Sequence, residues 1–119
     1  MSPLLFLASA LAGGVGAVLR YLVDLGVARL AGWRFPWGIL VVNLTGSFAL
    51  GLVTTALPEA AFVLGAGLLG GYTTFSTAML DAVALWRDGE RGVAMFDAVG
   101  MLVLGLVAAG LGLALGSAL

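Results

Sequence analysis

The sequence predicts an all-α membrane protein with four transmembrane helices. Of its 119 residues, 62% are hydrophobic and only 9% are charged, against about 25% charged residues in a typical soluble protein. A soluble domain of this length has too little interior to bury so much apolar surface. The charged residues also leave four uncharged runs, each close to the ~20 residues that a helix needs to cross a bilayer. These runs are 1–19, 35–58, 60–80 and 98–119.

The first helix is expected over about residues 3–29, with Pro3 in the first turn, where the missing N–H of proline costs no hydrogen bond. Ser9 and Gly13 lie one turn apart on this helix. Small residues at that spacing let a second backbone approach closely. The second helix is expected over about residues 36–57, after a short loop.

The third helix is expected over about residues 60–86 and is predicted to break near its middle, because Gly70 and Gly71 are adjacent there. The fourth helix is expected over about residues 93–116, after a charged loop. Short loops make consecutive helices antiparallel neighbours. The whole chain, residues 1–119, is therefore interpreted as one transmembrane domain.

The distribution of charge limits both orientation and function. Four arginines flank the first and third loops, whereas the second loop and both ends of the chain have none. The positive-inside rule then places the first and third loops in the cytoplasm. A net charge of −1 gives no reason to expect nucleic acid as a partner. The chain has no Cys and no His, which excludes thiol chemistry and the usual zinc sites and leaves little for an enzyme to work with.

A cluster of hydroxyl groups lies in the middle of the third apolar run. Five of the six residues 72–77 carry a hydroxyl, at a depth where water should be absent. Ser and Thr in membrane helices often bond to a carbonyl one turn back or to a neighbouring helix. Five such residues together cover every face of a helix, so we expect some of them to face a polar surface or a water-filled path.

Three further side chains have both a structural and a functional interpretation. Asn43 either links two helices or offers its two N–H groups to an anion in a pore. Arg20 either pairs with Asp24, four residues later, or places positive charge at a vestibule. Phe75 either packs against a neighbour or presents the electropositive edge of its ring to a small anion.

Three segments of the chain are together similar to a known family. They read GVGAVLRY at residues 14–21, WGILVVNLTGSF at 37–48 and GGYTTFST at 70–77, and the last is the most specific. In this order, and in a chain of this length, they resemble the Fluc (CrcB) fluoride channels.

The resemblance implies a passive, fluoride-selective channel that exports fluoride from the cytoplasm through the cell (inner) membrane and relieves its toxicity. It implies an antiparallel, dual-topology-type homodimer, and a structural Na+ ion at the dimer centre bound by the carbonyls of Gly70 and Thr73. Carried over by position, the residues that line the fluoride path are Asn43, Phe75, Ser76 and Thr77.

The chain departs from the family pattern at several positions. Ala78 stands where the family usually has a second Phe, Ile39 where it often has Thr, and the fourth helix has few hydroxyls. Together with the strong arginine bias, these departures leave open that the chain is one half of a heterodimeric fluoride channel, formed with a related chain. A small multidrug transporter needs a membrane-embedded carboxylate, and Asp24 comes too late in the first span. A structural membrane subunit remains a further alternative.

Overall fold

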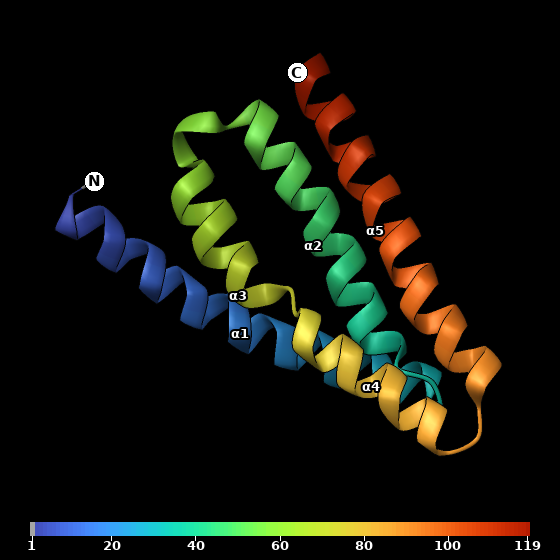
Figure 1. The fold of residues 1–119 in the computed structure, drawn as a ribbon. Coiled ribbons are helices and arrows are strands. Elements are labelled where there is room, and N and C mark those ends of the chain that lie inside the picture. The colour runs from blue at the N-terminus through green and yellow to red at the C-terminus, as the bar shows by residue number, and fades with distance from the viewer. Residues whose placement is uncertain (1) are drawn as a thin grey trace.

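The computed structural model describes residues 2–119, and these form four long helical spans (Figure 1). Helix α1 covers Pro3–Ala31, α2 covers Trp37–Ala56 and α5 covers Arg91–Ala118, while the third span, Pro58–Arg87, is made of several pieces. Each span is long and apolar enough to cross a membrane. The prediction of an all-helical protein with four transmembrane spans is confirmed.

The third span is interrupted near its middle, as predicted. A 3₁₀ turn, η1 (Pro58–Ala60), leads into a π-helix, η2 (Ala61–Leu69), and then into the single turn α3 (Gly70–Tyr72). The chain is extended through the next two residues and resumes as α4 (Phe75–Arg87). Figure 1 shows this break as the thin connection between α3 and α4.

The break lies a few residues beyond the glycine pair that was expected to cause it. Gly70 is helical, with φ −61° and ψ −38°. The extended residues are Thr73, with φ −78° and ψ 156°, and Thr74, with φ −147° and ψ 120°. The π-helix that precedes the break was not predicted; wide turns of this kind are often found beside functional sites.

Gly71 of this pair and Gly67, one turn earlier, serve helix packing instead. A Cβ atom on Gly71 would collide with the carbonyl oxygen of Gly13, and one on Gly67 would lie 2.7 Å from the carbonyl oxygen of Ser9. Only residues without a side chain allow α1 and the third span to cross at this distance. The close approach predicted from the small residues of the first helix is therefore present, and its partner is the third span.

Helices α2 and α5 cross in the same way. A Cβ atom on Gly112 would collide with the carbonyl oxygen of Phe48, and one on Gly51 would collide with that of Ala109. Along the same helix α2, Val42 is completely buried. The two helices therefore pack closely against each other beside the broken span.

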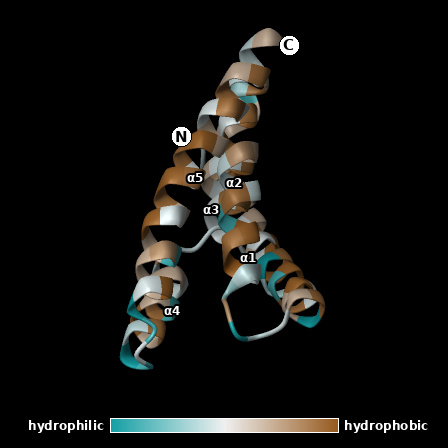
Figure 2. Ribbon diagram, turned by 90° about the vertical axis from the view of Figure 1, so that its right-hand side faces the viewer, coloured by the Kyte–Doolittle hydropathy of each residue, from teal (hydrophilic) through white to brown (hydrophobic). Residues whose placement is uncertain are grey.

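The two arginine-flanked loops lie at the same end of the molecule, away from both chain ends (Figure 1). Arg34 of the first loop forms an ion pair with Glu90 of the third, at 3.8 Å, and Arg91 lies 5.0 Å from the ring centre of Trp86. Figure 2 shows hydrophilic residues concentrated at this end and hydrophobic residues along the spans. This is the distribution expected of a protein that spans a bilayer.

Candidate functional site

One side chain from α2 bonds directly to the backbone at the break in the third span. The Nδ2 group of Asn43 donates to the Thr74 carbonyl at 2.9 Å, and the Thr74 N–H donates to Asn43 Oδ1 at 2.8 Å. The backbone N–H and C=O of Thr74, an extended and buried residue, are thus both hydrogen-bonded in a region where water is scarce. The Thr74 N–H needs an oxygen acceptor, so these two bonds also fix the orientation of the Asn43 side-chain amide.

Most of the hydroxyl cluster is bonded within the protein. Thr74 Oγ1 accepts from the Thr77 N–H at 3.2 Å and so caps α4, and Thr73 Oγ1 donates to the Leu69 carbonyl at 3.0 Å. Tyr72 pairs its hydroxyl with Thr45 on α2, at 3.0 Å. The structural interpretation of these hydroxyls is therefore largely correct, since they stabilise the interrupted helix and its contact with α2.

Several backbone carbonyls at the break lose their helical partners, those of Gly70 and Thr73 among them. The Thr74 N–H, which would donate to the Gly70 carbonyl in a continuous helix, donates to Asn43 instead. The Thr77 N–H, which would reach the Thr73 carbonyl, donates to the Thr74 hydroxyl. Free carbonyls inside a membrane protein are suitable ligands for a hard cation. The carbonyl oxygens of Gly70 and Thr73 are therefore donors of the kind that the expected Na+ ion would require.

A large cavity adjoins the break. Its volume is about 710 Å³, and its walls come from α2, the third span and α5. Asn43 and Phe75 line it, together with Gly70 and Thr73. Phe75 is 78% exposed, so its ring projects outward from the single chain. Within the described part of the chain, no charged side chain lines this cavity.

A second, smaller cavity of about 290 Å³ lies toward the arginine-rich end. Thr77 lines it together with Arg34 and three carboxylates, those of Asp24, Asp81 and Asp88. The residues expected along one fluoride path are therefore divided, with Asn43 and Phe75 at the large cavity and Thr77 at the small one. Ser76 lies between these two positions in sequence and is exposed.

Arg20 is partly buried on α1. The ion pair considered for Arg20 and Asp24 is not formed, since the described residues contain no contact within 4.0 Å between them. Asp24 instead lies against Gly38, where a Cβ atom would collide with its carboxylate. Arg20 does not line either cavity.

Two features of the structure were missed from the sequence: a buried carboxylate on α5 and a sulfur acceptor at the site. Asp97 on α5 is 1% exposed, and neither carboxylate oxygen has a hydrogen-bond partner within residues 2–119. Asp97 shares one helix face with Ala94 and Met101, and Ala94 is also buried. This spacing was the sequence signal that Asp97 would be buried. Met101 itself accepts a second hydrogen bond from Asn43, at 3.1 Å between Nδ2 and Sδ. No sequence pattern marks a methionine as a hydrogen-bond acceptor.

The fold and the site together define a small four-span membrane protein with a polar helix break beside an uncharged cavity, as expected of a membrane channel. The sequence matches the family described as CrcB-like protein, Camphor Resistance (CrcB), over residues 7–113. The chain therefore belongs to the CrcB family, and the resemblance to the Fluc (CrcB) channels is confirmed.

Individual relatives match over nearly their whole length. The Fluoride-specific ion channel FluC 1 of Leifsonia xyli subsp. xyli is 48% identical over 122 residues, which cover 98% of this chain and 89% of the relative. The Fluoride-specific ion channel FluC of Agrobacterium fabrum is 45% identical, over 87% of this chain and 89% of the relative. The FluC 2 protein of Mycobacterium tuberculosis, with the same description, is 50% identical, over 86% and 82%.

Proposed function

We propose that this chain forms a passive, fluoride-selective channel that exports fluoride through the cell (inner) membrane and so relieves its toxicity. The observation that carries the proposal is the polar break, held by Asn43 at the wall of an uncharged cavity between hydrophobic spans. The names of relatives that match almost end to end supply the ion. They favour a channel over a small multidrug transporter or a structural membrane subunit.

The physical requirement is a replacement for the water around fluoride. A small anion holds its hydration shell tightly, so the pore has to supply N–H groups, hydroxyls and aromatic ring edges. Asn43 and Phe75, which share the large cavity, are the main stations in this proposal, and Ser76 and Thr77 are weaker ones nearer the arginine-rich end. Arg20 lines neither cavity, and its proposed part is limited to a positive charge that raises the anion concentration near the path.

No energy source beyond the membrane potential is required. A negative interior drives an anion outward with about 2.3 kcal/mol per charge per 100 mV. The carboxylates that line the small cavity oppose the entry of anions there, whereas the large cavity has none within the described residues. The large cavity is therefore the preferred part of the path.

A second copy of this chain is proposed to cover the large cavity in an antiparallel homodimer. Mostly apolar residues line the cavity, and the exposed ring of Phe75 extends from it, so a protein partner would bury both. Two facing breaks would bring together the carbonyls of Gly70 and Thr73 from each subunit, four oxygens that fit one structural Na+ ion. The ion would offset the negative ends of these carbonyls and tie the subunits together.

The test uses the purified chain alone in liposomes loaded with fluoride or chloride. We expect rapid efflux of fluoride and little of chloride, with fluoride efflux lost when Na+ is replaced throughout by a large organic cation and regained when Na+ is added. Equal rates for the two halides would refute fluoride selectivity. Efflux only after a related chain is added would instead identify the chain as half of a heterodimer.

A further inference from the structure

The amide of Asn43 makes three hydrogen bonds of unequal strength. Two join it to the backbone of Thr74, at 2.8 and 2.9 Å, and are needed to satisfy the helix break. The third runs from its remaining N–H to the sulfur of Met101, at 3.1 Å. Both hydrogens of Nδ2 are therefore occupied, and an anion can bind Asn43 only by displacing one of these partners.

The two partners differ in how readily they can be displaced. Losing the Thr74 carbonyl as an acceptor would leave a buried backbone group unpaired, which is costly in a membrane protein. A thioether sulfur is a weak acceptor and needs no hydrogen bond when it is released. The Met101 side chain is also long and unbranched, so it moves aside with little strain. The N–H that faces Met101 is the one available to an anion.

We propose that Met101 is a specificity-determining residue of this channel, whose sulfur occupies the anion-binding N–H of Asn43 and is displaced when fluoride arrives. The inference rests on the proposed function, because it places fluoride at Asn43. The sulfur keeps the N–H satisfied in the empty state and weakens fluoride binding enough for the ion to leave, which conduction requires. An anion that binds the N–H more weakly than fluoride does not displace the sulfur.

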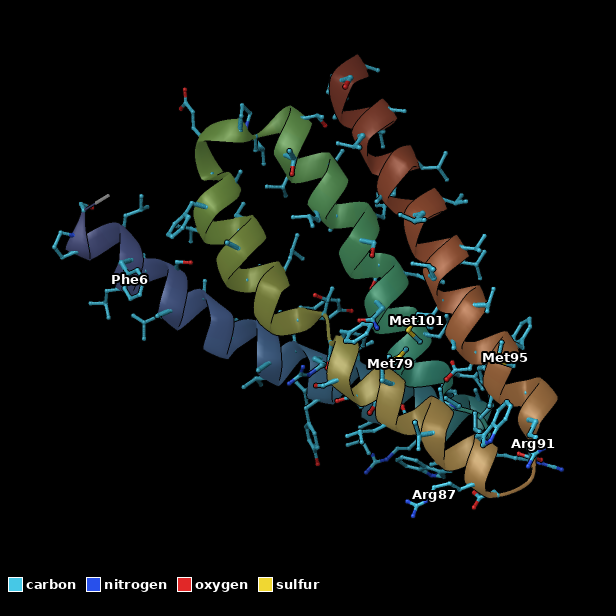
Figure 3. All side chains as sticks on the ribbon, in the orientation of Figure 1. Phe6, Met79, Arg87, Arg91, Met95 and Met101 are labelled. Carbon is cyan, nitrogen blue, oxygen red and sulfur yellow. The ribbon has the colours of Figure 1, made fainter. Side chains whose placement is uncertain are left out.

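A second methionine in the same cavity provides a matched control. Met79 on α4 and Met101 on α5 both line the large cavity, and Figure 3 shows them extending into the space between these helices. Only Met101 is hydrogen-bonded to Asn43. Replacing either methionine by leucine changes the side-chain volume little. A packing effect would therefore appear in both variants, whereas the proposed role belongs to Met101 alone.

The first measurement needs no mutation. Asn43 is the only Asn in the chain, and there is no Gln. A ¹⁵N NMR spectrum of the wild-type protein in detergent micelles or nanodiscs should therefore contain one pair of side-chain amide signals. On titration with fluoride, we expect the proton facing Met101 to shift strongly and the proton bonded to Thr74 to stay nearly in place. Titration with chloride should move neither. The proposal is wrong if both protons move equally or only the Thr74-bonded one moves.

The second measurement compares the Met101→Leu and Met79→Leu variants in fluoride flux and in the same titration. Losing a hydrogen bond of typical net strength changes an equilibrium constant about fivefold. Met101→Leu should therefore lower the fluoride concentration at half-saturation by up to about fivefold, and Met79→Leu, which removes no hydrogen bond to Asn43, should shift it clearly less. An unchanged or raised midpoint in Met101→Leu, or equal shifts in both variants, would overturn the role of Met101.

The fluoride channel and the role of Met101 can be refuted separately. A wild-type protein that carries no fluoride and shows no amide shift would refute the proposed function, and the role of Met101 with it. Wild-type flux with the midpoint of Met101→Leu unchanged would refute only the role of Met101. The Thr74-bonded amide proton of each variant serves as the folding control, because its shift reports an intact break.

Discussion

Replacing Asn43 by leucine should destabilise the protein as well as abolish fluoride flux. The leucine side chain has a similar volume but can form no hydrogen bond. The variant therefore removes both bonds to the Thr74 backbone at once and leaves a buried N–H and a buried C=O without partners. The mutation tests the inference that the amide of α2 stabilises the interrupted third span.

The size of the effect follows from these two groups. Leaving a buried donor or acceptor unsatisfied costs about 1–3 kcal/mol, so two groups cost about 2–6 kcal/mol. For a chain of this length each kcal/mol corresponds to about 4 °C in the midpoint of thermal unfolding. We expect the Asn43→Leu protein to unfold roughly 10 °C or more below the wild type, measured in detergent at a fixed Na+ concentration.

Ser47→Ala is the matched control. Ser47 lies one turn further along α2 and lines the same cavity, but its hydroxyl makes no hydrogen bond within residues 2–119. The Ser47→Ala protein should unfold within a degree or two of the wild type. If Asn43→Leu unfolds at the wild-type temperature, the two bonds to Thr74 do not stabilise the break and the structural argument is wrong.

Three other substitutions have defined outcomes. Gly71→Ala places a methyl group against the backbone of Gly13 and should lower the unfolding temperature or the yield of folded protein. Gly14→Ala places its methyl group in open space and should lower neither. Equal behaviour of the two variants would contradict the close crossing of α1 and the third span. Thr74→Val removes the cap of α4 and should lower the free energy of unfolding by about 1 kcal/mol. Thr74→Ser keeps a hydroxyl at this position and should restore the wild-type stability. If serine does not restore it, the Thr74 hydroxyl does not stabilise α4 by capping. Phe75→Ile should slow fluoride efflux from liposomes severalfold, because it removes the aromatic ring edge. The unfolding temperature of the isolated chain should not change, because the ring is exposed. If the variant releases fluoride at the wild-type rate, this ring is not part of the fluoride path.

The number and type of the elements could be predicted because they depend on local composition. The long uncharged runs predict membrane helices, because a helix satisfies all its backbone hydrogen bonds within one segment, whereas an extended segment or loop exposed to lipid does not. The spacing of small residues predicted that helices would cross closely, because small side chains let two backbones approach, but it did not predict which helices would pack together. The sequence also indicated that the third span would break near its middle.

The exact place of the break was not predictable from the local sequence. Glycine weakens a helix, and Gly70 and Gly71 were the natural candidates, yet both remain helical, and α1 packs directly against Gly71. The chain opens at Thr73 and Thr74, residues of ordinary backbone freedom. A side chain 31 residues away, Asn43, supplies the hydrogen bonds that the helix gives up there.

The same distinction applies to the site. The chain's residues alone marked Asn43, the hydroxyl cluster and Phe75 as polar or aromatic groups in an apolar setting, which is costly without a partner. Only the packing of α2, the third span and α5 decided what each one contacts. It bonded the hydroxyls of Thr73 and Thr74 to the backbone, buried Asp97 without a partner within residues 2–119 and brought the sulfur of Met101 to the amide of Asn43. Composition governs the transfer of each segment into lipid, whereas hydrogen-bond partners far apart along the chain depend on how the helices cross.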